Sequence, residues 1–166
     1  MYLITIDGPA GSGKTTLASL IHDLLASEGE NVLTIHMDDL YPGWDGAFTE
    51  HVSKSLTSIL EQARTLNEIQ IPQYDWISGR FMEPLSCPTP STLIIEGVGS
   101  GQKATQGSAD LKLWIEAPSD IALARVLERD GEAIREEMVH WQFREVEHFR
   151  SENTESAADY RIKSAP

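Results

Sequence analysis

The chain has 166 residues, of which 40% are hydrophobic, and a formal net charge of −13 from 26 acidic and 13 basic side chains. This length suits a single domain, so we expect 1–166 to fold as one unit. The acidic excess argues against a nucleic-acid surface, which needs a basic face. No apolar run approaches the roughly 20 residues that span a bilayer, so we expect no membrane partner. The single cysteine, Cys87, excludes an internal disulfide framework and fits a reducing compartment, which favours a cytoplasmic location.

The first predicted element is a strand over Tyr2–Asp7, an apolar and β-branched run. It leads into Gly8-Pro9-Ala10-Gly11-Ser12-Gly13-Lys14-Thr15, which has the spacing of a phosphate-binding loop. A helix should follow from Lys14 to Ser27, and its apolar face should hold Leu17, Leu20, Ile21, Leu24 and Leu25. The motif therefore stands in the strand–loop–helix context that it requires.

Each residue type in this loop suits the phosphates of a nucleotide. The glycines let consecutive N–H groups converge on an anion, and the helix that follows adds its positive dipole end. Lys14 would bind the β- and γ-phosphates, and the Thr15 hydroxyl would be a ligand of Mg²⁺. We therefore expect ATP and Mg²⁺ as cofactors, bound by Gly8, Ala10, Gly11, Ser12, Gly13, Lys14, Thr15 and Thr16.

Further along the chain, predicted strands and helices alternate. We expect strands over 31–36, 92–96, 110–115 and 159–162, and helices over 49–66, 119–129 and 132–149. The last helix should bury Val139, Phe143, Val146 and Phe149, while the less regular segment 69–90 could hold a hairpin of 69–71 with 80–82. This alternation indicates a parallel sheet covered by helices on both faces, with ligands at the carboxyl ends of its strands.

Acidic residues follow two of the predicted strands. Asp38 and Asp39 come after the second strand, where one carboxylate could accept a proton from an attacking hydroxyl and one could hold Mg²⁺. Aspartate also favours turns and helix caps, which is the structural alternative. Glu96 ends the third strand and suits Mg²⁺ coordination through water, and Gly97 permits close approach of the backbone.

Loops and helices beyond the strands supply further candidates. Trp44-Asp45-Gly46 and Tyr74-Asp75-Trp76 could stack on a planar ring and bind sugar hydroxyls, or their tryptophans could anchor the loops. Arg125, Arg129 and Arg135 could stabilise the charge of a transferred phosphoryl group, or pair with glutamates on a helix face; Arg129 is the favoured candidate.

Together these features resemble the uridine kinase family of phosphate-loop kinases over nearly the whole chain. The matching segments are Asp38 to Tyr41, Pro72-Gln73-Tyr74-Asp75-Trp76, Ile94-Ile95-Glu96-Gly97 and Arg125 to Asp130. The resemblance implies an α/β fold, the P-loop NTPase three-layer α/β/α sandwich, with a five-stranded parallel sheet of order 2-3-1-4-5 and a helical lid at about 125–150. It also implies that Asp38, rather than Asp39, is the catalytic base.

The candidate residues together make up one expected site. Lys14, Asp38 and Arg129 would be catalytic, Thr15, Asp38 and Glu96 would support the metal, and Arg125 would contact the nucleotide. The phosphate acceptor would contact Tyr41, Asp45, Tyr74 and Arg80.

The expected reaction transfers the γ-phosphate of ATP to a hydroxyl of a small molecule. A nucleoside is the favoured acceptor, and a sugar or a vitamin-like alcohol is an alternative, because the chain has Ile77-Ser78-Gly79-Arg80 where the family usually has a histidine. The first loop is also similar to cytidylate kinases, so a nucleoside monophosphate is the second hypothesis. The third is a nucleotide-binding regulatory protein without a small-molecule acceptor. The oligomeric state is open, with a homodimer as one option.

Overall fold

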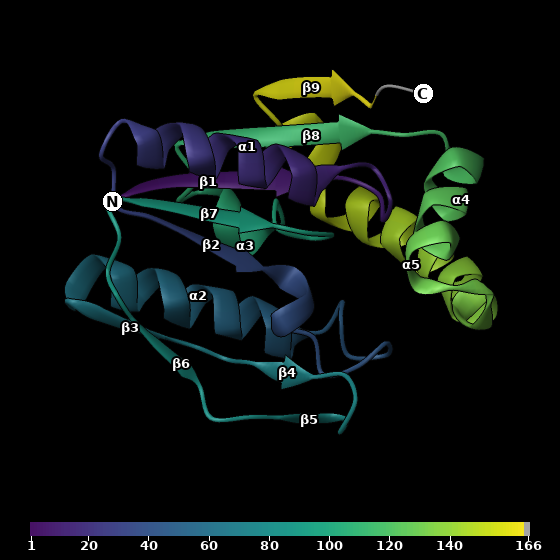
Figure 1. The fold of residues 1–166 in the computed structure, drawn as a ribbon, viewed down its shortest axis with the longest axis horizontal. Helices are drawn as coiled ribbons and strands as arrows, with labels where there is room; N and C mark the ends of the chain where they lie inside the picture. Colours follow the sequence, from purple (N-terminus) through teal and green to yellow (C-terminus); the bar gives the residue numbers. More distant parts are fainter. Residues whose placement is uncertain (165–166) are drawn as a thin grey trace.

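The computed structural model describes residues 1–164; Ala165 and Pro166, the last two residues of the predicted single domain, lie outside the described residues. Its centre is a five-stranded sheet in the order β2-β7-β1-β8-β9 (Figure 1). All neighbouring strands in this sheet are parallel. The strands are β1 (Tyr2–Asp7), β2 (Val32–His36), β7 (Thr92–Glu96), β8 (Leu111–Glu116) and β9 (Tyr160–Lys163). When these five strands are renumbered 1 to 5 in the order in which they occur along the chain, their order in the sheet is the predicted 2-3-1-4-5.

Helices cover both faces of the sheet, because side chains alternate between the faces along each strand. Ile4 and Ile94 face α1 (Lys14–Ser27) in the smaller core. Leu3 and Ile95 face the larger core, which includes residues of α2 (Glu50–Thr65), α4 (Ser119–Asp130) and α5 (Arg135–Glu152). Short elements complete the chain: η1 (Met37–Asp39), α3 (Lys103–Gln106), η2 (Glu132–Ile134) and α6 (Thr154–Ala157). The predicted α/β class and three-layer arrangement are confirmed.

The predicted hairpin of 69–71 with 80–82 is wrong in its pairing. β3 (Glu68–Ile71) pairs with β6 (Leu85–Pro88), and β4 (Tyr74–Asp75) pairs with β5 (Arg80–Phe81) inside it. The Asp75 carboxylate accepts hydrogen bonds from Ile77 N and Ser78 Oγ, and this turn closes the inner pair. The tip of the hairpin lies where expected, but each arm is divided into two short strands.

The prediction of which face of α5 is buried is also largely wrong. Val139, Phe143 and Val146 are 37%, 74% and 55% exposed, whereas Met138, Trp141 and Glu145 are buried. Tertiary contacts decide this rotation of the helix, because the rings of Tyr41, Trp44 and Phe48 pack on Trp141. On α1, similarly, Leu20 and Leu24 of the predicted apolar face are exposed.

The strands of the sheet point toward the end of the molecule where α4 and α5 lie (Figure 1). The phosphate loop, between β1 and α1, lies at this end as well. The predicted lid, 125–150, comprises the end of α4, η2 and most of α5. Within residues 1–164, no helix is both long and apolar enough to cross a membrane.

Candidate active site

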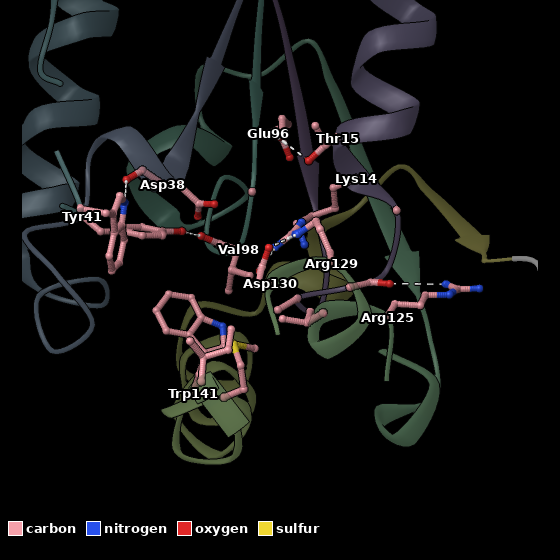
Figure 2. Close-up of a pocket in the computed structure, with 18 of the residues that line it drawn as sticks. Lys14, Thr15, Asp38, Tyr41, Glu96, Val98, Arg125, Arg129, Asp130 and Trp141 are labelled. Atoms are coloured by element: carbon pink, nitrogen blue, oxygen red, sulfur yellow. Dashed lines mark hydrogen bonds and ion pairs between the residues drawn. The ribbon is translucent and has the colours of Figure 1, made fainter. Parts of the chain in front are cut away.

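A cavity of about 600 Å³ lies at the carboxyl ends of the strands (Figure 2). Its walls come from the phosphate loop, the loops after β2 and β7, the turn after β4, and the helical segment α4 to α5. The lining residues are Ala10, Gly11, Gly13, Lys14, Thr15, Thr16, Asp38, Tyr41, Trp44, Trp76, Glu96, Gly97, Val98, Arg125, Val126, Arg129, Asp130, Ile134, Met138 and Trp141. All the residues predicted to be catalytic or to support the metal are therefore brought together in one cavity.

Two glycines let the phosphate loop lie directly on its neighbours. Gly8 and Gly11 have φ angles of 144° and 79°. A Cβ at Gly8 would lie 2.3 Å from the Ile115 carbonyl oxygen, and a Cβ at Gly11 would lie 2.2 Å from that of Ala122. Gly8 and the buried Ser12 belong to the loop but do not line the cavity.

Lys14 is a buried cation at the base of the cavity. Its Nζ donates a hydrogen bond of 2.7 Å to the Pro9 carbonyl oxygen. Burial lowers the pKa of the Lys14 ammonium, and the nearby carboxylates of Asp7 and Glu96 partly offset this shift. Nucleotide phosphates would provide a stronger partner than one carbonyl, because hydrogen bonds between ionised groups are shorter and stronger.

Asp7 is a buried acid behind the phosphate loop that was not predicted from the sequence as part of the site. Its carboxylate accepts hydrogen bonds from the main-chain nitrogens of Gly8, Gly99 and Gly101 at 2.7–2.9 Å. Burial outweighs these hydrogen bonds and raises the pKa of Asp7 to about 6. The sequence feature that could have identified Asp7 is its position directly before the first glycine of the motif.

Thr15 and Glu96 form the oxygen pair expected to support Mg²⁺. The Thr15 hydroxyl donates to Glu96 Oε1 at 3.0 Å, and His36 Nδ1 lies 2.5 Å from the same oxygen. The hydrogen bond to Glu96 raises the pKa of His36. Hydroxyl and carboxylate oxygens are ligands that Mg²⁺ prefers, so these residues fit the metal of a metal–nucleotide complex. Residues 1–164 contain no group of three or more His, Cys, Asp or Glu side chains arranged to hold a metal.

Asp38 is the middle residue of η1, which follows β2 directly, and its carboxylate points toward the middle of the cavity (Figure 2). Enclosure in the cleft raises the pKa of this carboxyl group, while the positive charge of Lys14 acts in the opposite direction. Across the cavity, Arg129 donates two hydrogen bonds of 2.7 and 2.6 Å to its neighbour Asp130. Arg125 Nη1 donates to Ser164 Oγ at 2.7 Å.

Of the predicted acceptor contacts, only Tyr41 lines the cavity, and its hydroxyl donates to the Val98 carbonyl oxygen. The carboxylate of Asp45 is turned to solvent and lies 3.6 Å from Arg144 Nη1. Tyr74 packs against Trp76 and Phe81 instead. Arg80 is exposed on β5. Neither Tyr74 nor Arg80 lines the cavity, although Trp76, on which Tyr74 packs, does.

Glu145 and Trp141 on α5 belong to the site but were not predicted from the sequence. Glu145 is 2% exposed, and its Oε2 accepts hydrogen bonds from Ala10 N at 3.0 Å and Trp141 Nε1 at 2.9 Å. Burial raises the pKa of Glu145 to about 7. The signal was a tryptophan and a glutamate four residues apart on one helix face, which the more regular apolar pattern of Val139, Phe143 and Val146 concealed.

No protein-family model matches the chain. Among curated proteins it is similar to the uridine kinase of Lactobacillus johnsonii, with 28% identity over 142 residues that cover 77% of this chain and 67% of the relative. The uridine kinase of Borrelia duttonii is 30% identical over 138 residues, covering 77% and 66%. The cytidylate kinase of Halobacterium salinarum is 30% identical over 128 residues, covering 77% and 58%. The chain spans about two thirds of the length of the uridine kinases that it matches.

Solved structures share the fold at lower identity. A possible uridine kinase from Bacillus stearothermophilus superposes with a TM-score of 0.72 and 21% identity, over 97% of this chain and 88% of that one. Phosphoribulokinase from Rhodobacter sphaeroides superposes with a TM-score of 0.72 and 14% identity, over 98% and 69%. At these identities the superpositions show a shared fold and nothing more specific.

Proposed function

Because the chain is a uridine kinase-like P-loop kinase, we propose that it transfers the γ-phosphate of ATP to a hydroxyl of a small molecule, with a nucleoside as the favoured acceptor. One observation carries the proposal: the carboxylate of Asp38 points into the same cavity that Lys14 and the Thr15–Glu96 pair line. The residues proposed to bind the phosphate donor and the residue proposed to accept the proton thus line one cavity.

In the donor half, Lys14 and the amides of the P-loop would bind the phosphates. Thr15, with Glu96 through water, would hold Mg²⁺, which neutralises charge on the phosphates when bound. Arg129 would move from Asp130 to the transferred group, and Arg125 would contact the nucleotide. The segment 125–150 would serve as the lid over the cavity.

In the acceptor half, Asp38 would act as the general base. The acceptor hydroxyl attacks the γ-phosphorus, the bond to ADP breaks, and the hydroxyl proton passes to the Asp38 carboxylate. A pKa raised toward neutrality makes a carboxylate a better proton acceptor, so enclosure of Asp38 supports this role.

The cytidylate kinase relative makes a nucleoside monophosphate the second candidate. A monophosphate would need cations of its own. Arg64 and Arg80, the two candidates in the sequence, are both exposed and absent from the cavity lining. The cations that line the cavity, Lys14, Arg125 and Arg129, belong to the P-loop side. This arrangement favours an uncharged acceptor.

The proposal is tested by ADP release from Mg-ATP in the presence of nucleosides, nucleoside monophosphates or sugars. Release stimulated by a nucleoside and abolished by Lys14→Ala would support it. Lys54→Ala, an exposed change on α2, is the matched control and should leave release unchanged. Stimulation only by monophosphates would favour the second candidate. ATP turnover that responds to no acceptor would favour a regulatory protein and overturn the proposal.

A further inference from the structure

The exposed face of α5 carries a regular stripe of side chains, which we call the α5 seam: Glu136, Val139, Phe143, Val146 and Arg150. Successive members are alternately three and four residues apart, which is the spacing of the contact positions in a coiled-coil helix. All five side chains are exposed, and Phe143 at the centre is 74% exposed. The opposite face of α5 packs on the protein, so the seam is the face that residues 1–164 leave uncovered.

The centre of the seam is apolar and continuous. Val139, Phe143 and Val146 are neighbours on the helix surface, because residues three and four apart lie side by side. None of the three belongs to either hydrophobic core of the protein. A single exposed apolar residue is ordinary in a soluble protein, but an exposed row at heptad spacing is typical of a surface that packs on another helix.

A hollow lies beside the seam. This second cavity has a volume of about 450 Å³, and Phe143 lines it together with Trp44, Trp141 and Arg144, among others. Arg144 joins the two elements that form it, because its guanidinium donates to the carbonyl oxygens of Trp44 and Asp45 at 2.7 and 2.9 Å. A protruding ring next to a fixed hollow suits a symmetric contact, in which the ring of each copy enters the hollow of the other.

The charges of the seam match a second copy of this chain in antiparallel orientation. Glu136 stands at one end and Arg150 at the other, each seven residues from Phe143. When two copies cross antiparallel at Phe143, Glu136 of each lies opposite Arg150 of the other. A parallel pairing would instead set like charges side by side, which is unfavourable. Within residues 1–164, neither Glu136 nor Arg150 has an ion-pair partner.

Other contacts and occupants fit less well. The exposed apolar pair of α1, Leu20 and Leu24, has Asp23 and Glu28 beside it and no Lys or Arg between residues 15 and 30. Two copies meeting there would bring acids together. A membrane surface attracts helices with a cationic polar face, whereas α5 contains five glutamates and three arginines. The α5 seam is the apolar helix face whose charges complement themselves.

We propose that the chain forms an isologous dimer in which the α5 seams of two copies pack antiparallel about Phe143. Each contact then occurs twice, so two Glu136–Arg150 pairs flank an apolar centre. The seam extends over 15 residues. This corresponds to about 21 Å of helix, so the interface falls at the low end of specific interface sizes and the dimer is reversible. The proposal concerns the outer face of α5 and does not depend on the kinase function.

The first test is sedimentation equilibrium of the full chain at protein concentrations from about 1 to 500 µM, where we expect a monomer–dimer equilibrium with a Kd on the order of 10–100 µM. Phe143→Glu should raise this Kd at least about tenfold, because it buries an unpaired charge at the centre of the contact. Leu20→Glu, a comparable change at an exposed residue of α1, is the control and should leave the Kd within about twofold. A wild type that stays monomeric, as expected if another protein or only solvent covers the seam, would overturn the proposal, as would equal Kd values for the two variants.

Charge reversal tests the antiparallel arrangement separately. Glu136→Arg and Arg150→Glu each set like charges opposite one another at two points of the dimer, and each should raise the Kd about fivefold or more. Combining the two changes restores opposite charges and should return the Kd to within about threefold of the wild-type value. Arg64→Glu, at an exposed position of α2, controls for the change in net charge. Circular dichroism verifies that each variant is folded. A combined variant that dimerises no more tightly than either single variant would overturn the antiparallel arrangement.

Discussion

The Glu145 carboxylate on α5 accepts a hydrogen bond of 3.0 Å from the main-chain nitrogen of Ala10 in the P-loop. The same oxygen accepts the indole N–H of Trp141, which lines the cavity. One buried atom therefore connects the phosphate loop, α5 and the acceptor side of the cavity. It also places an acid beside the site where nucleotide phosphates would bind.

Glu145→Gln should tighten nucleotide binding. The amide oxygen can keep both hydrogen bonds, while the negative charge beside the phosphates is removed. We expect a three- to tenfold lower Kd for ATP at pH 8, or roughly 1 kcal/mol, and a smaller effect at pH 6, where Glu145 already carries a proton. Isothermal titration calorimetry at the two pH values measures the difference.

Glu147→Gln removes the same charge from an exposed position of the same helix and serves as the control. Equal effects of the two variants would mean that net charge, rather than the Glu145–Ala10 contact, governs affinity.

The stability of the protein without ligand should depend on Glu145 protonation. Its pKa rises from 4.5 to about 7 on folding, so the folded state binds more protons than the unfolded state between these values. The contribution of Glu145 to the free energy of unfolding is therefore present at low pH and is lost as the pH rises through about 7. We expect the wild type to lose roughly 1–3 kcal/mol relative to Glu145→Gln between pH 5 and 8, measured by urea unfolding. Parallel stability profiles for the two proteins would refute this assignment.

Asp38→Asn should lower kcat by a factor on the order of 10² or more while the Kd for ATP changes little, because the amide cannot accept the hydroxyl proton. Asp39→Asn makes the same change one residue away, at a side chain outside the cavity lining, and should retain most activity. Rapid-quench kinetics with the best acceptor measure the chemical step. Equal activity of Asp38→Asn and wild type would remove Asp38 from the role of base.

Gly11→Ala should destabilise the fold. Its φ of 79° is strained for alanine, and the new Cβ would lie 2.2 Å from the Ala122 carbonyl oxygen. Strain and overpacking together should cost about 2–4 kcal/mol, visible as a lower Tm in thermal unfolding. Gly107→Ala, where φ is −73° and a new Cβ would meet no other atom within 4 Å, should change stability by less than about 1 kcal/mol. Similar Tm values for both variants would show that the loop yields to the added methyl group.

The donor half of the cavity could be predicted because its chemistry is local in sequence. The spacing from Gly8 to Thr15 dictates a loop of converging amides, and strands alternating with helices dictate where Asp38 and Glu96 meet it. Parallel strands end at one edge of a sheet, so residues from distant segments could be placed together without any pairing information. The sheet order came from the family resemblance and not from the residues themselves.

The acceptor half could not be predicted because long-range packing decides it. Helical spacing alone favoured burial of Phe143, but the rings of Tyr41, Trp44 and Phe48 turn α5 so that Trp141 and Glu145 are buried instead. The hairpin pairs β3 with β6 and β4 with β5 around the Asp75 turn, and neither Tyr74 nor Arg80 lines the cavity. Neither contact has a signal in the spacing of apolar residues.

The buried carboxylate of Asp7 links two loops of the protein. It ties the first residue of the P-loop to Gly99 and Gly101 in the loop after β7, at a buried point behind the cavity. A shift of one loop without the other would break these hydrogen bonds, so we expect the two loops to move together. Gly97 N also donates to the Ile6 carbonyl oxygen, and Glu145 on α5 accepts from Ala10 N, so the first strand and its P-loop are held to the loop after β7 on one side and to α5 on the other.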